Sequence, residues 1–157
     1  MATFEGDFRT PSGRFALVAA RFNAFIVGHL IQGAQDGLKR HGVAAENIDL
    51  VYVPGSLEIP IAAKQLIDNG GYSAILCLGA VIRGETDHYD IVSSESAKGL
   101  ATLSQQSGVP IINAILTTNT VEQAVNRAGA KQGNKGFEAA VSAIEMVNLL
   151  AQLRSQG

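Results

Sequence analysis

The 157-residue sequence has one cysteine, no long apolar run and no excess of positive charge, and each shortage excludes a class of protein. Cys77 has no second cysteine to pair with and stands inside an apolar run, so we interpret it as a buried packing residue without a disulfide or metal role. The longest strand-like apolar stretch, residues 74–82, falls far short of the roughly 20 residues that a membrane span needs. We therefore expect no membrane-spanning segment.

Charge and the start of the chain narrow the choice further. Twelve Lys and Arg stand against 14 Asp and Glu, and this balance provides no basic field for nucleic acid or an anionic membrane. No basic region followed by an apolar one stands near Met1, so we expect no signal peptide and a cytoplasmic location. With 46% hydrophobic residues and no linker or repeat, residues 1–157 are expected to form a single domain.

Apolar runs alternate with helical patterns along the chain. Four runs are continuously apolar, as in parallel strands that are buried on both faces: residues 15–20, 48–54, 74–82 and 110–118. Amphipathic helical patterns occupy residues 23–41, 56–69, 86–106 and 120–129, and a fifth begins near Phe137. This alternation predicts a three-layer α/β/α sandwich with a flavodoxin-like parallel sheet in the strand order 2-1-3-4.

Polar residues and glycines mark the ends of the predicted helices. Asn23 is the predicted N-cap of the first helix, and Gly42 is its stop signal. Thr120 and Gln123 have the spacing of a capping box at the start of the fourth helix.

The opening residues 1–13 alternate like a strand, but Pro11-Ser12-Gly13 separates them from the α/β core of residues 14–157. An isolated strand cannot satisfy its own backbone groups. We therefore expect this N-terminal arm to pair with the sheet of a neighbouring subunit.

The stretch GAVIRGET, residues 79–86, has the spacing of a phosphate-binding P-loop, with Glu85 in place of the lysine. A carboxylate at that position repels nucleotide phosphates, so we exclude nucleotide hydrolysis. The turn still suits a single phosphate, because a helix that begins near Thr86 presents free N–H groups, and Gly84 permits close approach. An ordinary strand-to-helix turn with Thr86 as N-cap is the alternative.

His88 lies in the first turn of the helix that follows. The helix dipole disfavours the imidazolium there, which predicts a neutral general acid/base near pH 7, although a structural role stays open. Asp87 and Asp90 flank His88 without a second His or Cys at ligand spacing, so we expect no metal. His29 and His41 have no chemical neighbours in the sequence and are weaker candidates.

The loops after the first two predicted strands carry further candidates. Gly55, Ser56 and Glu58 form a set that suits a polyhydroxylated ligand, or else Ser56 caps a helix and Glu58 favours its first turn. Phe22 ends the first strand, where its ring either lies over a flat heterocycle or belongs to the core. Covalent catalysis is not expected, because no G-x-S-x-G motif or activated cysteine is present.

Five segments together resemble the 6,7-dimethyl-8-ribityllumazine synthase family. They are RFN (21–23), VPGSLEIP (53–60), GAVIRGETDHYDIV (79–92), TTNTVEQAVNRAG (117–129) and GNKGFEAAVSAIEM (133–146). The resemblance extends from about Arg14 to Leu150 and implies a cofactor-independent transferase, the penultimate enzyme of riboflavin biosynthesis. In that reaction 5-amino-6-(D-ribitylamino)uracil condenses with 3,4-dihydroxy-2-butanone 4-phosphate and releases phosphate and water.

The resemblance also assigns a role to individual residues, with His88 transferring protons. The pyrimidine and its ribityl chain would contact Phe22, Ser56, Leu57, Glu58, Ala80, Val81, Ile82 and Asn113. The phosphate would contact Glu85, Thr86 and Arg127, with Asn23, Gly55 and Lys135 as further candidates. Two positions depart from the common family pattern: Asn113 stands where phenylalanine is frequent, and Glu85 where many members have a small residue.

An oligomer with shared active sites is also implied by the resemblance. Family members form homopentamers in which Asn113 and Arg127 would face His88 of the adjacent subunit, and some build an icosahedral shell of sixty chains. The short turn at residues 129–136 resembles that of the shell-forming members, so we expect a shell here. Small-molecule substrates are the expected ligands, and riboflavin synthase is a candidate partner.

Two other classes of function are alternatives to an enzyme of this family. A flavodoxin-type flavin carrier or a phospho-receiver domain is disfavoured, because AARFN, residues 19–23, is neither a hydroxyl-rich phosphate loop nor an acidic pair. A non-catalytic protein of the same fold that binds flavins or forms a shell is the second alternative. The presence of Phe22, Glu58, Thr86, His88 and Arg127 argues for an enzyme.

Overall fold

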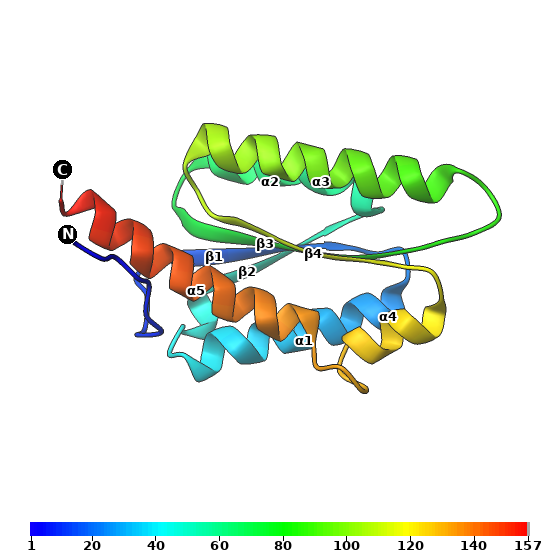
Figure 1. Cartoon of the computed structure of the whole chain (residues 1–157), viewed down its shortest axis with the longest axis horizontal. Coiled ribbons are helices and arrows are strands. Elements are labelled where there is room, and N and C mark those ends of the chain that lie inside the picture. The colour runs from blue at the N-terminus through cyan, green and yellow to red at the C-terminus, as the bar shows by residue number, and fades with distance from the viewer. Residues whose placement is uncertain (157) are drawn as a thin grey trace.

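A computed structural model describes residues 1–156 and shows a three-layer α/β/α sandwich (Figure 1). The central sheet is parallel, in the order β2-β1-β3-β4, and consists of β1 (Arg14–Ala20), β2 (Ile48–Val53), β3 (Tyr72–Ile82) and β4 (Ile111–Thr118). One face is covered by α2 (Ile59–Asn69) and α3 (His88–Ser107). The other is covered by α1 (Ala24–Arg40), α4 (Val121–Arg127) and α5 (Lys135–Arg154). The predicted sandwich and strand order are confirmed.

The strands are apolar throughout because helices bury both faces of the sheet. Successive side chains of a strand point to opposite faces, so each strand supplies two cores. Leu17 and Leu76 pack under α1 and α5, whereas Val18 and Cys77 pack under α2 and α3. Cys77 has no exposed surface, and burial raises the pKa of its thiol. The buried position predicted for Cys77 is confirmed.

Helix starts differ from the sequence prediction at two places. The third helix, α3, begins at His88 with Asp87 at its N-cap, two residues later than expected. Ser56–Glu58 is a separate 3-10 turn, and α2 begins only at Ile59. No helix within residues 1–156 has both the length and the apolar character needed to cross a bilayer.

The capping box predicted at α4 forms with a shifted return bond. Thr120 Oγ1 accepts a hydrogen bond from the N–H of Gln123 at 3.1 Å. The side chain of Gln123 accepts from the N–H of Asn119 at 2.8 Å, one residue before the cap. Two N–H groups at this helix start are thereby satisfied.

Residues 1–13 form no strand within the single chain and lie along α5 (Figure 1). Asn148 Nδ2 donates to the carbonyls of Asp7 and Arg9 at 2.9 and 3.0 Å, and Gln152 donates to a third carbonyl of the arm at 2.8 Å. Side-chain amides thus satisfy acceptors that we expected a sheet to satisfy. Pairing of the arm with a neighbouring subunit stays a prediction.

A polar cluster joins three strands at their N-terminal ends, opposite the loops that carry the predicted chemistry. Asp49 of β2 accepts hydrogen bonds from Arg14 of β1 and from the hydroxyl of Tyr72 of β3, the latter at 2.7 Å. The hydrogen bonds from Tyr72 and Arg14 lower the pKa of the Asp49 carboxyl. The ionised form of Asp49 therefore stabilises the folded state.

We expect Asp49→Asn to lower the thermal midpoint at pH 7 by about 1–3 °C, because an amide does not replace the carboxylate in this partly exposed cluster. The lowered pKa means that the stabilisation is fully present above about pH 4 and is lost as pH falls through the folded-state pKa. Melting curves of the two proteins should therefore converge in acid. Asp68→Asn, which breaks an ion pair within one helix, is the control and should change the midpoint less.

Candidate functional site

A cavity of about 420 Å³ opens beyond the carboxyl ends of β1, β2 and β3. This is the edge at which open parallel sheets bind ligands. Its lining comes from three loops, the end of β3 and the start of α3: Phe22, Asn23, Pro54, Gly55, Ser56, Leu57, Glu58, Ala80, Val81, Ile82, Gly84, Thr86, His88, Tyr89 and Val92. The cavity therefore holds most of the residues that the sequence nominated, although their roles stay predictions.

Four nominated residues do not line the cavity of the single chain. Asn113 lies on the edge strand β4, in a separate recess beside α3. Glu85 is exposed on the turn before α3, Arg127 is exposed at the end of α4, and Lys135 begins α5. In a single chain, Arg127, which is expected to bind the phosphate, and Asn113, which is expected to contact the ring, therefore lie apart from the other nominated residues.

Asn23 fixes the turn between β1 and α1 in a way that the sequence did not predict. Its φ of 64° is the one positive value among the non-glycine residues of the described chain. Asn23 occupies the predicted N-cap position of α1, but its side chain makes no cap bond, and Nδ2 donates instead to the carbonyl of Ala80 at 2.7 Å. The bond ties the first loop to the end of β3 and leaves the neighbouring Phe22 ring 73% exposed at the cavity rim.

Ser56 forms part of the buried base of the cavity and is only 6% exposed. Gly79 of β3 lies beneath it, and a Cβ at that position would stand 2.5 Å from Ser56 Oγ. Glycine at position 79 therefore makes room for the hydroxyl. The alternative interpretation of Ser56 as a side-chain helix cap is wrong, because neither the 3-10 turn nor α2 has a side-chain cap bond.

The charge of the cavity lining is unfavourable for an anion. The lining residues include Glu58 and contain no Lys or Arg. His88 is exposed at the first position of α3, and its backbone N–H donates to Thr86 Oγ1 at 3.3 Å. An anion at this turn meets backbone N–H groups from this chain, so the balancing cation has to come from outside the cavity. Within residues 1–156, no three His, Cys, Asp or Glu side chains are grouped as metal ligands.

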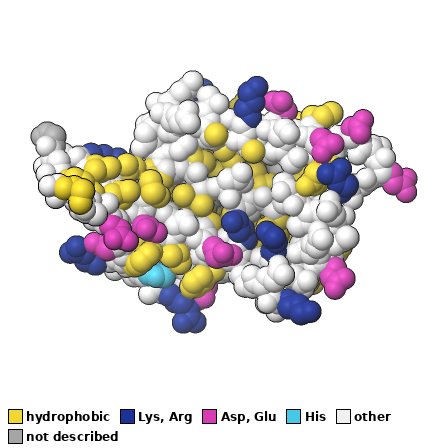
Figure 2. Space-filling view, in the orientation of Figure 1, with side chains coloured by type: hydrophobic (Ala, Val, Ile, Leu, Met, Phe, Trp, Pro, Cys, Tyr) yellow, Lys and Arg dark blue, Asp and Glu magenta, His cyan; other side chains and the backbone are white. Residues whose placement is uncertain are grey.

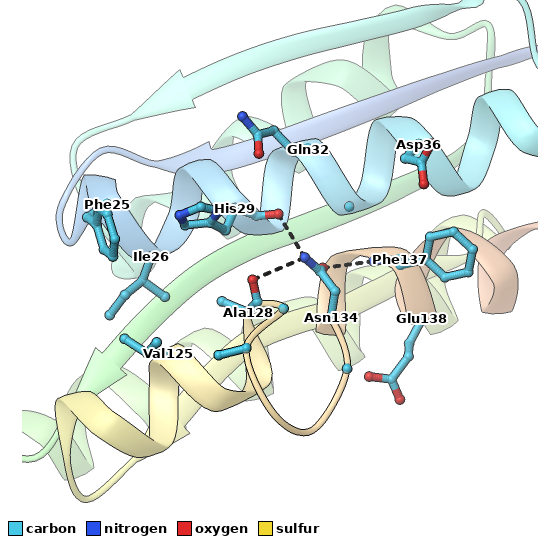
Figure 3. Close-up of a pocket in the computed structure, with 14 residues that line it drawn as sticks. Phe25, Ile26, His29, Gln32, Asp36, Val125, Ala128, Asn134, Phe137 and Glu138 are labelled. Atoms are coloured by element: carbon cyan, nitrogen blue, oxygen red, sulfur yellow. Dashed lines mark hydrogen bonds between the residues drawn. The ribbon is translucent and has the colours of Figure 1, made fainter.

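A larger cavity of about 770 Å³ lies between α1, α4 and the start of α5 (Figure 3). Asn134 shapes it: Nδ2 donates to the carbonyls of His29 and Ala128, and Oδ1 accepts from the N–H groups of Gly136 and Phe137. Asn134 is the N-cap of α5 and was not among the predicted caps, although an asparagine directly before a helical stripe is a recognised cap signal. Of the residues nominated from the sequence, the weaker candidate His29 alone lines the larger cavity, so the smaller one is the candidate site.

Comparison with known families identifies the family of this chain. The model of the 6,7-dimethyl-8-ribityllumazine synthase family matches residues 12–151. The chain belongs to this family. The resemblance seen in five segments of the sequence is confirmed.

Among solved structures, a GDP-L-fucose synthetase from Naegleria fowleri is similar at 13% sequence identity and a TM-score of 0.41. The match covers 99% of this chain and 49% of that one, so this chain spans about half the length of that structure. A likeness of this size carries no argument about the site.

We expect Asn23→Ala to lower the free energy of unfolding by about 1–3 kcal/mol, because alanine loses the bond to Ala80 and strains the left-handed backbone. Asn23→Gly keeps the conformation and loses only the bond, so it should cost about 0.5–1.5 kcal/mol. Urea denaturation measures both values. Equal losses would show that the backbone conformation contributes nothing.

Proposed function

We propose that this protein is a 6,7-dimethyl-8-ribityllumazine synthase. It condenses 5-amino-6-(D-ribitylamino)uracil with 3,4-dihydroxy-2-butanone 4-phosphate to give 6,7-dimethyl-8-ribityllumazine, phosphate and water. The observation that carries the proposal is a single cavity at the carboxyl ends of the strands that collects Phe22, Ser56, Glu58 and His88, in a chain of this family.

The pyrimidine binds between the exposed ring of Phe22 and the end of β3. Phe22 is 73% exposed, so its ring is free to stack on a flat heterocycle. Ser56 and Glu58, with Leu57 between them, offer a hydroxyl and a carboxylate to the polar ring and its ribityl chain. Ala80, Val81 and Ile82 present their backbone groups to the ring edge. The Ala80 carbonyl accepts the bond from Asn23 and keeps a second lone pair.

The phosphate of the second substrate binds at the turn before α3. Glu85 and Thr86 contribute their N–H groups, and the Thr86 hydroxyl stands beside them. Since no cation lines the cavity, Arg127 and Lys135 of a second copy supply the positive charge, and Asn113 of that copy completes the wall over the ring.

The chemistry requires alignment and proton transfer and no bound cofactor. The uracil amine adds to the ketone carbonyl and gives an imine with loss of water. Elimination then breaks the C–O bond to phosphate and leaves an enol, which becomes a second ketone. The ribitylamino nitrogen closes the ring on this ketone with loss of a second water, and the lumazine is complete. Holding both substrates in one cavity supplies much of the acceleration. His88 lies beside the phosphate turn and within the same lining, where it takes and returns protons at each stage.

The direct test is to mix the two substrates with the protein and to follow the fluorescence of the lumazine product. Product formation well above the uncatalysed rate supports the proposal. A rate equal to the uncatalysed one would favour the alternative of a non-catalytic flavin-binding or shell-forming protein.

We expect His88→Ala to lower kcat by about 10²-fold without abolishing activity, because proton transfer is lost while alignment is kept. His29→Ala is the matched control: this exposed histidine of α1 lies outside the candidate site, and its loss should leave kcat unchanged. An unchanged kcat in His88→Ala would remove this residue from the mechanism.

Shared sites require an oligomer, and the surface of the chain favours one. Figure 2 shows hydrophobic side chains in the band between the two helix layers, where Figure 1 places the edge strand β4. The outer edge of this strand pairs with no strand of the described chain. Burial of the band against a second copy brings the recess of Asn113 to an interface.

We expect static light scattering at neutral pH to give about one megadalton for a closed shell of sixty 16.4 kDa chains. A pentamer would give roughly 82 kDa and would refute the shell while keeping the shared site. A monodisperse monomer that retains full activity would contradict the shared site itself.

A further inference from the structure

Arg83 stands directly after β3 and spans the turn that leads to α3, although it does not line the cavity. Its N–H donates to the carbonyl of Thr118 at 2.9 Å. Its guanidinium carbon lies 4.3 Å from the centroid of the Tyr89 ring, and Nε donates to Asn119 Oδ1 at 3.1 Å. A third side-chain interaction, to the carboxylate of Asp90, measures 3.6 Å. One side chain therefore connects the end of β3, the first turn of α3 and the loop after β4.

The turn that Arg83 spans has few interactions of its own. Gly84, Glu85, Thr86 and Asp87 are all exposed. The one hydrogen bond that joins residues 84–86 to another residue is the local one from the His88 N–H to Thr86 Oγ1. The shape of the turn consequently depends on how its two ends are held, and Arg83 at one end contacts Tyr89 and Asp90 at the other.

We propose that Arg83 is a positioning residue, which fixes the N–H groups of Glu85 and Thr86 and the imidazole of His88 in one arrangement around the cavity. The role for anion binding rests on the proposed function. The guanidinium suits this task because its planar face stacks on an aromatic ring while its N–H groups reach two further partners. Arg83 itself does not line the cavity, and its guanidinium already contacts Tyr89, Asn119 and Asp90, so its charge is not directed at a ligand.

The first measurement is hydrogen exchange of the amides of His88, Asp90 and Ile91 in the ligand-free protein. They report on the turn because these N–H groups donate to Thr86 Oγ1 and to the Asp87 carbonyl at its end. In Arg83→Ala we expect exchange to be about tenfold faster with an unchanged thermal midpoint, because the interactions that alanine removes are local and lie on the surface. Arg83→Lys keeps the charge without the planar fork, and its exchange rate should lie between those of the wild-type protein and Arg83→Ala. Arg21→Ala removes the same charge from another exposed loop residue and should leave exchange of these three amides unchanged.

The second measurement is titration with inorganic phosphate, together with KM for each substrate. Arg83→Ala should weaken phosphate binding and raise KM for the butanone phosphate by about tenfold, with KM for the pyrimidine changed by less than about twofold. Arg127→Ala provides the contrast of a direct phosphate ligand, with weaker phosphate binding and unchanged exchange at the turn.

The outcomes separate the two proposals. Weaker phosphate binding in Arg83→Ala with unchanged exchange would make Arg83 a direct ligand and overturn the positioning role. Unchanged phosphate binding together with unchanged exchange would also overturn the positioning role. If the wild-type protein neither binds phosphate nor forms product, the proposed function fails. Exchange in Arg83→Ala then still decides whether Arg83 holds the turn: faster exchange supports this, and unchanged exchange overturns it.

Discussion

Burial of both faces of β3 is the constraint on which the rest of the structure depends. This strand pairs with β1 on one side and β4 on the other, and its residues from Ala74 to Leu78 have no exposed surface. Leu76 and Leu78 belong to one core and Ile75 and Cys77 to the other. Each such aliphatic side chain contributes about 1.5–3 kcal/mol by leaving water, so neither helix layer can separate without a large loss. The cavity begins where this strand ends.

The candidate site accordingly changes from a buried floor to an exposed rim. Ser56 and Ala80 at its base are held by the sheet, through the space left by Gly79 and the bond from Asn23. Thr86 and His88 at its rim are open to water. Electrostatic interactions are weak in water and strengthen when water is excluded, so a second chain that covers the rim would both supply charge and make that charge more effective. In the proposed oligomer, the contact between subunits would therefore also complete the site.

The four strands followed from the sequence because short, continuously apolar runs between helical patterns fit a sheet buried on both faces. The order 2-1-3-4 was a hypothesis about topology that the structure confirms. The positions of Phe22, Ser56 and His88 around one cavity followed from the rule that loops after parallel strands meet at one edge. Helix starts were less predictable: the sequence suggested caps by Asn23 and Thr86, whereas tertiary contacts hold Asn23 on β3 and α3 begins only at His88. Arg83 gave no local signal, because its partner Asn119 lies 36 positions away.

The single cysteine gives the molecule a built-in reporter. Cys77 lies in the middle of β3, has no exposed surface, and carries a thiol whose pKa is raised by burial. A thiol reagent reacts with the thiolate and must reach it, so alkylation requires the sheet to open between its two helix layers. The rate of labelling thus measures the opening of the core, free of signals from fraying ends or mobile loops. Comparing that rate at low and high protein concentration would test whether association slows unfolding.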